Sequence, residues 1–130
     1  MAEQKMKVLL VDDDKFLLGM YASKFAKDGL EPVSCISGVE ALAKLKDNYK
    51  PDIILLDIIL PGMDGLEILE VIKKENLAPD AIIVMLTNQG GADDIAKAKQ
   101  LGVHGYIVKA TTIPSEVVTE VLKIVAQNKK

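Results

Sequence analysis

The sequence alternates along its length between short apolar runs and stretches with helical periodicity. Runs that are apolar at nearly every position, rather than at every second one, are typical of strands buried on both faces, as in a parallel sheet covered by helices. The runs are Lys7–Val11, Glu31–Ile36 (the weakest of them), Asp52–Leu56, Ala81–Leu86 and Gly105–Val108. This alternation predicts an α/β domain with a parallel sheet.

The stretches between the runs carry helix signals. Gly29 stands where the first helix should end, and two pairs, Ser37 with Glu40 and Asp64 with Glu67, have capping-box spacing at the next two helix starts. The residues expected on the buried helix faces are Leu18, Tyr21, Ala22 and Phe25, then Ile68, Leu69 and Ile72, then Ile95, Ala98 and Leu101, and finally Val118, Val121, Leu122 and Val125.

The fourth helix is predicted from about Ala92 to Leu101, and the fifth opens at Pro114. Five strand–helix units in 130 residues predict a doubly wound, five-stranded parallel sheet with five helices on both of its faces. A closed barrel of this kind needs about 250 residues. We expect residues 1–130 to form a single domain.

Composition excludes several classes of function. The net charge is −3, and all 16 basic residues are lysine, so the arginine fork that reads bases and phosphates is missing and no direct nucleic-acid partner is expected. No apolar run approaches the roughly 18 residues that span a bilayer, and the N-terminus has no signal-peptide pattern. The single cysteine, Cys35, fits a reducing compartment. We therefore expect a cytoplasmic protein with no membrane contact.

Polar residues follow four of the five runs. They are Asp12, Asp13 and Asp14, then Asp57, Thr87 and Lys109. Each alone has a structural explanation: Asp14 fits a helix cap equally well, and a single aspartate, threonine or lysine at a strand end is ordinary turn chemistry. In a doubly wound sheet, however, the carboxyl ends of the strands share the edge where ligands bind. The sequence therefore predicts that these side chains meet.

Such a cluster requires a cation. Neighbouring carboxylates at about 4 Å repel by roughly 4 kcal/mol per pair at an effective dielectric constant of 20, and oxygen ligands favour Mg²⁺ or another hard divalent ion. Asp57, on the central strand, is the predicted nucleophile for a phosphoryl group, with Asp12 and Asp13 holding the metal. Lys109 would neutralise phosphoryl oxygens, and Thr87 would donate a hydrogen bond to the modified group.

At these residues the sequence resembles a receiver domain of the two-component response regulators, over Lys7 to about Asn128. The matching pieces are Val-Leu-Leu-Val-Asp-Asp-Asp (8–14), Leu-Leu-Asp-Ile-Ile-Leu-Pro-Gly-Met-Asp-Gly (55–65), Met-Leu-Thr (85–87) and Gly-Tyr-Ile-Val-Lys (105–109). The resemblance implies the flavodoxin-like strand order 2-1-3-4-5, which receiver domains share with flavodoxin.

The resemblance also implies roles at the metal site. Asp57 would accept phosphate from a sensor histidine kinase or a histidine phosphotransfer protein. Asp13 and Asp57 would bind Mg²⁺ (or Mn²⁺) directly, Asp12 would bind it through water, and the carbonyl of Ile59 would be a further ligand.

The signalling roles follow from the same resemblance. Thr87 would move toward the acyl phosphate and Tyr106 would swing inward behind it. The signal would reach a downstream protein target through the surface of the fourth helix, fifth strand and fifth helix. The chain would be an enzyme only in catalysing its own phosphorylation and dephosphorylation.

The sequence departs from the family pattern at three points. Ala110 follows Lys109 where proline is usual, so we predict a trans peptide bond there. Asn88 replaces a small residue after Thr87. The absence of arginine removes the salt bridges of dimeric transcription-factor receivers, which favours a stand-alone monomer.

Two other functions fit the sequence less well. An Mg²⁺-dependent aspartyl phosphatase on a related sheet would carry a second acid two residues after the nucleophile, where this chain has Ile59. A receiver-like binding module that no longer uses phosphate would be expected to lack Asp13, Asp57 or Lys109, and all three are present.

Overall fold

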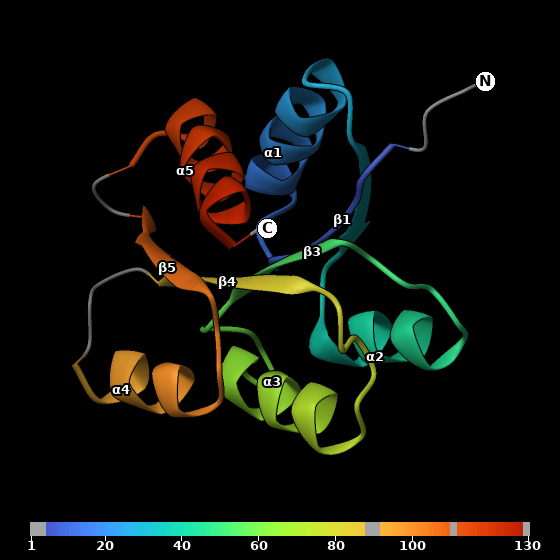
Figure 1. The fold of residues 1–130 in the computed structure, drawn as a ribbon, viewed down its shortest axis with the longest axis vertical. Helices are drawn as coiled ribbons and strands as arrows, with labels where there is room; N and C mark the ends of the chain where they lie inside the picture. Colours follow the sequence, from blue (N-terminus) through green and yellow to red (C-terminus); the bar gives the residue numbers. More distant parts are fainter. Residues whose placement is uncertain (1–4, 88–91, 110–111, 129–130) are drawn as a thin grey trace.

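The computed structural model describes residues 5–87, 92–109 and 112–128. Its strands form the parallel sheet that the sequence predicts, in the order β2-β1-β3-β4-β5 that the family resemblance implies (Figure 1). The elements are β1 (Lys7–Val11), α1 (Lys15–Lys27), β2 (Glu31–Cys35), α2 (Gly38–Lys46), β3 (Ile53–Asp57), α3 (Gly65–Lys74), β4 (Ile82–Thr87), α4 (Ala92–Gln100), β5 (Gly105–Val108) and α5 (Pro114–Asn128). In the part of the chain that the structure describes, no helix is both long and apolar enough to cross a membrane.

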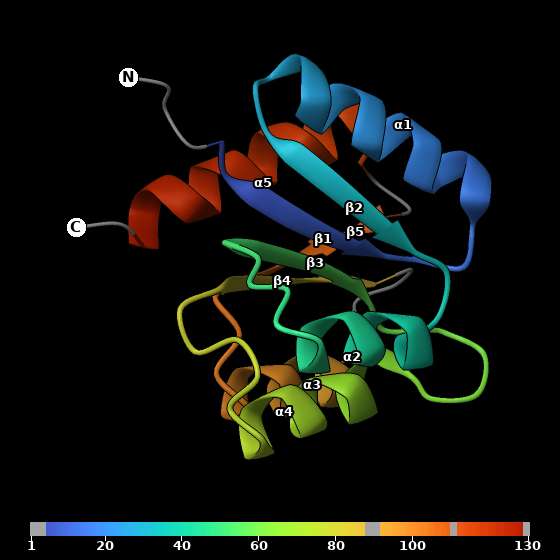
Figure 2. The same ribbon diagram turned by 90° about the vertical axis from the view of Figure 1, so that its right-hand side faces the viewer.

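Helices cover both faces of the sheet. α1 and α5 lie on one face, and α2, α3 and α4 lie on the other (Figures 1 and 2). Successive residues of the central strands enter opposite cores: Ile53 and Leu55 pack with α1 and α5, whereas Ile54 and Leu56 pack with α2 and α3. The continuous apolar runs of the sequence follow from this burial on both faces.

Several element boundaries differ from the sequence prediction. Asp57 and Thr87 are the last residues of β3 and β4 rather than the first residues after them. β2 ends at Cys35, before the exposed Ile36, and α4 ends at Gln100, one residue short of Leu101. The apolar runs mark where side chains are buried. Strand pairing depends on backbone hydrogen bonds, which polar residues such as Asp57 and Thr87 also make, so strand ends and run ends differ.

The predicted caps form. Asp64 and Glu67 make a complete capping box, with the Glu67 carboxylate accepting the Asp64 N–H at 3.0 Å. Ser37 caps α2 by accepting the Glu40 N–H at 3.2 Å, but the Glu40 carboxylate accepts the N–H of Ile36 instead of closing the box on Ser37. Gly29 has φ +90° just past the end of α1, a conformation that glycine adopts without strain.

His104 is a structural residue directly before β5. Its ring Nδ1 accepts the backbone N–H of Ile83 on β4 at 3.0 Å, and its backbone N–H donates to the Ile83 carbonyl at 2.8 Å. Burial, together with the nearby Lys73 ammonium, lowers the pKa of His104 below its usual value. The neutral imidazole is therefore the form that the fold stabilises.

We expect the hydrogen bond from the Ile83 N–H to His104 Nδ1 to make the free energy of unfolding depend on pH. A lowered folded pKa leaves the histidine contribution intact above about pH 6.5, its unfolded value, and removes it progressively as the pH falls below that point. His104→Asn offers an amide oxygen to the Ile83 N–H without titrating. Chemical denaturation at pH 7.5 and pH 5.5 should show a larger loss of unfolding free energy for the natural chain than for the variant. Equal losses would contradict the assignment.

Candidate functional site

The strand order reverses between β1 and β3. β1 and β3 are neighbours, with Val11 opposite Leu56, and so the residues that follow these partners, Asp12 and Asp57, lie side by side. α1 covers one face of the sheet and α3 the other (Figure 1), so the carboxyl ends of β1 and β3 meet between the two helical layers. Doubly wound sheets bind ligands at this point.

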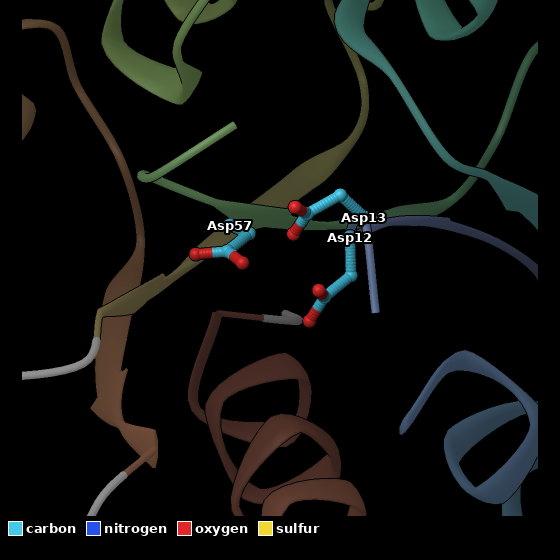
Figure 3. A group of neighbouring side chains, drawn as sticks. All are labelled: Asp12, Asp13 and Asp57. Carbon is cyan, nitrogen blue, oxygen red and sulfur yellow. The ribbon is translucent and has the colours of Figure 1, made fainter. Parts of the chain in front are cut away.

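Three carboxylates meet there. Asp12, Asp13 and Asp57 each place one oxygen so that all three oxygens lie within 4.8 Å of one another (Figure 3). Asp12 and Asp57 are 1% and 2% exposed, whereas Asp13 faces solvent. The cluster therefore has two buried acids and one at its mouth.

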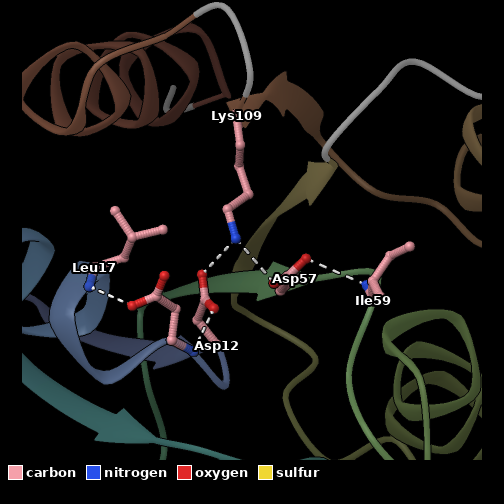
Figure 4. A network of polar contacts seen from close by, with 6 residues as sticks. Asp12, Leu17, Asp57, Ile59 and Lys109 are labelled. Carbon is pink, nitrogen blue, oxygen red and sulfur yellow. Dashed lines mark hydrogen bonds and ion pairs between the residues drawn. The ribbon is translucent and has the colours of Figure 1, made fainter.

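Lys109 joins the two buried acids. Its Nζ donates to Asp12 Oδ2 at 2.9 Å and to Asp57 Oδ2 at 3.1 Å (Figure 4). Lys109 follows β5, two strands away from β3, and its long side chain reaches back across the end of the sheet. The sequence predicts Lys109 at this edge of the sheet, but it does not predict the pairing of Lys109 with Asp12.

Backbone donors fix the remaining carboxylate oxygens. Ile59 N–H donates to Asp57 Oδ1 at 3.2 Å, and Asp14 N–H donates to Asp12 Oδ1 at 2.9 Å. Asp14 itself caps α1 by accepting the Leu17 N–H at 3.1 Å. The three consecutive aspartates thus differ in their contacts: Asp12 is held by Lys109, Asp13 is exposed, and Asp14 serves the helix.

The surroundings shift the acidity of the two central groups. Burial, followed by the charge of Asp12, raises the pKa of Asp57 to about 6, although Lys109 and the Ile59 N–H act in the opposite direction. Burial alone would lower the pKa of Lys109, but its bonds to Asp12 and Asp57 outweigh burial and raise that pKa above its usual value. At pH 7 Asp57 is mainly ionised and more basic than an ordinary aspartate, which suits a nucleophile.

The residues present fit a divalent cation. In their ionised forms, three carboxylates and one ammonium leave a net charge of −2 at the cluster. Lys109 compensates only part of the acidic charge, and the donors that remain are oxygens, which hard divalent ions prefer.

Thr87 and Tyr106 occupy different surroundings. Thr87 ends β4 opposite Val108, with its side chain 4% exposed. Tyr106, in β5, is 39% exposed, and the Lys99 ammonium of α4 lies 5.5 Å from the centre of its ring. The structure thus places Thr87 at the carboxyl edge of the sheet and Tyr106 on the outer surface beside α4. The peptide bond between Lys109 and Ala110, and Asn88, lie outside the described residues.

The sequence analysis missed one functional group, the Ile59 N–H, which donates to Asp57. The Ile59 carbonyl, which the family resemblance implies as a metal ligand, stays a prediction. The Ile59 side chain is exposed. No signal in the sequence marks a backbone donor, since the position accepts an apolar residue that faces solvent.

Comparisons with known proteins agree with this arrangement. A family model described as the response regulator receiver domain matches residues 8–121. Protein PilG of Pseudomonas aeruginosa is 32% identical over 104 residues, which cover 80% of this chain and 76% of that protein. Chemotaxis protein CheY1 of Helicobacter pylori is 32% identical over 121 residues, covering 92% of this chain and 96% of that protein. The crystal structure of chemotaxis protein CheY4 of Vibrio cholerae has a TM-score of 0.84 at 26% identity, covering 93% of this chain and 99% of the other.

Proposed function

Because this chain belongs to the response regulator receiver domain family of two-component signalling proteins, we propose that it accepts a phosphoryl group on Asp57 in a reaction that depends on Mg²⁺ or Mn²⁺. The observation that carries this proposal is the buried Asp57 carboxylate, which the Lys109 ammonium and the Ile59 N–H hold at the carboxyl end of β3. The acids Asp12 and Asp13 lie beside it.

The residues of the site have separate roles in this proposal. An Asp57 oxygen attacks phosphorus in line with the leaving group, so that the bond to the donor breaks as the acyl phosphate bond forms. Lys109, already within hydrogen-bond distance of Asp57, neutralises charge on the phosphoryl oxygens. Thr87 donates a hydrogen bond to the phosphorylated form.

Asp12, Asp13 and Asp57, with the carbonyl of Ile59, would hold the metal. When bound, the ion supplies positive charge that neutralises the carboxylates and the phosphoryl oxygens. The structure supports this role through the convergence of the three carboxylates. It offers no acid at the position two residues after Asp57, where Ile59 stands, so it gives no support to an aspartyl phosphatase.

Partners follow from the family and from the surface around Tyr106. The phosphodonor is a histidine kinase or a histidine phosphotransfer protein, and the output is a downstream protein target. We assign the output surface to α4, β5 and α5, where Tyr106 lies exposed against Lys99. Inward movement of Tyr106 would break its contact with Lys99 and change this surface.

One experiment tests the function directly. The protein is incubated with acetyl phosphate and Mg²⁺, and the intact mass is measured with time. We expect one phosphoryl group per chain, which is lost again on standing because acyl phosphates hydrolyse, and no modification when Mg²⁺ is chelated. A chain that stays unmodified under these conditions would overturn the proposal.

The metal site gives a separate prediction. Mg²⁺ should bind the unphosphorylated protein with roughly millimolar affinity, since few carboxylates replace its waters. Asp13→Asn should weaken binding by about tenfold, because one carboxylate of the cluster becomes neutral. Asp14→Asn is the matched control, because asparagine still caps α1 and Asp14 lies outside the cluster. Equal losses in titration calorimetry would show that the metal is placed wrongly.

A further inference from the structure

Two helices of the fold begin with a buried glycine. Gly38 is the first residue of α2 and Gly65 the first residue of α3. Neither has a positive φ, and glycine disfavours a helix relative to alanine. Backbone conformation therefore explains neither glycine, and the space available for a side chain must.

The two positions differ in what a side chain would meet. A β-carbon on Gly38 would meet the flexible end of the Ile68 side chain, with Cγ1 at 2.6 Å. A β-carbon on Gly65 would overlap the carbonyl oxygen of Asp57 and lie 2.8 Å from Ile58 Cα. A side chain can rotate away, whereas the backbone at the end of a central strand cannot move without moving Asp57 itself.

Gly65 also closes the loop that holds the Asp57 carboxylate. Its N–H donates to the Ile58 carbonyl at 2.7 Å, and the N–H of Ile58 donates to Leu86 of β4 at 2.9 Å. The next residue, Ile59, gives its N–H to Asp57 Oδ1. The first turn of α3 thus contacts the backbone between Asp57 and Ile59, whose N–H holds the Asp57 carboxylate. Figure 4 shows that hydrogen bond.

From these contacts we infer that Gly65 is a positioning residue for the phosphoacceptor. Its lack of a β-carbon lets α3 approach the end of β3, and this approach sets the direction of the Ile59 N–H and of the Asp57 carboxylate. The inference rests on the proposed phosphorylation of Asp57 and adds a residue that touches neither phosphate nor metal. A displacement of about 1 Å at a reacting group can slow a reaction by about a hundredfold.

The test compares Gly65→Ala with Gly38→Ala. Both changes add one methyl group at the buried first residue of a helix, but only Gly65→Ala meets the Asp57 backbone. With acetyl phosphate and saturating Mg²⁺, we expect Gly65→Ala to slow phosphorylation at least tenfold and Gly38→Ala to change it less than about twofold. In the unphosphorylated protein, the Ile59 amide resonance should shift in Gly65→Ala and stay in place in Gly38→Ala.

A second pair keeps the inference testable if Gly65→Ala does not fold. Glu67→Ala removes the exposed half of the α3 capping box, and Glu40→Ala removes the corresponding carboxylate of α2. We expect Glu67→Ala, and not Glu40→Ala, to slow phosphorylation severalfold and to shift the Ile59 amide. Equal behaviour within each pair that folds would overturn the inference. Failure of the natural chain to take up phosphate would instead remove the proposed function, and the amide resonances would still decide the role of Gly65.

Discussion

Asp57→Asn should abolish uptake of the phosphoryl group and raise the stability of the metal-free fold. The amide is not a nucleophile, so the acceptor is lost. The natural carboxylate is buried beside Asp12, which raises its pKa to about 6, so its ionised form is disfavoured in the folded state. We expect the variant to gain about 1–2 kcal/mol at pH 7, since one unit of pKa is worth about 1.4 kcal/mol and the lost bond to Lys109 offsets part of the gain.

Intact mass measurement with acetyl phosphate and Mg²⁺ checks the first part of this prediction. Denaturant unfolding in the presence of a chelator checks the second. A group with a raised folded pKa stabilises fully below its unfolded value and loses that contribution as the pH rises through about 6. The difference between variant and natural chain should therefore shrink as the pH falls from 7 to 4. Asp80→Asn, which removes an exposed carboxylate, is the control. Stoichiometric phosphate on Asp57→Asn would exclude Asp57 as the main acceptor.

The fold could be predicted from the sequence because burial on two faces leaves a mark in every strand. Residues such as Ile53 and Ile54, adjacent in the chain, enter opposite cores, and this produces runs that are apolar throughout. Capping residues are equally local, and Asp64 with Glu67 forms the predicted box. Hydrophobicity does not mark the strand ends, because Asp57 and Thr87 belong to their strands although they are polar.

The site could be predicted only as a set of residues. The rule that parallel strands end at one edge brings Asp12, Asp13 and Asp57 together. It does not state which atoms pair. The Lys109–Asp12 contact joins residues 97 positions apart, and the Ile59 N–H is a backbone group with no residue preference. Such contacts depend on side-chain reach and on local backbone direction, which periodicity and composition do not encode.

Lys109→Met should be the most destabilising single change at the site. Methionine keeps much of the length of lysine but removes the charge that contacts both Asp12 and Asp57 at 2.9 and 3.1 Å. Both acids are buried, and removing one partner of a buried ion pair leaves charge without compensation, at a cost of about 3–5 kcal/mol. We expect a loss near the lower figure in a chelator at pH 7, together with loss of phosphorylation.

Three measurements separate the loss of the Lys109 charge from the loss of its packing, because each reduces the uncompensated negative charge of Asp12 and Asp57 in another way. Without Lys109 the pKa of Asp57 should rise further, because the positive charge that most lowers this pKa is gone. Lowering the pH from 7 to 5 should therefore stabilise the variant relative to the natural chain. Mg²⁺ should stabilise the variant more than the natural chain, since a cation then meets the carboxylates without competition from the ammonium. Asp57→Asn combined with Lys109→Met should recover part of the loss in a double-mutant cycle.

Lys46→Met provides the reference for an ordinary ion pair. Lys46 lies 3.8 Å from Glu75 with both side chains about half exposed, and such pairs contribute about 0–1 kcal/mol. The buried Lys109 pairings and this exposed one differ mainly in how far water can replace the lost partner. If the two substitutions cost the same in denaturant unfolding, and neither Mg²⁺ nor low pH distinguishes them, then Lys109 does not compensate the buried acids. The net charge that favours a divalent ion at Asp12, Asp13 and Asp57 would then have to be counted without the Lys109 ammonium.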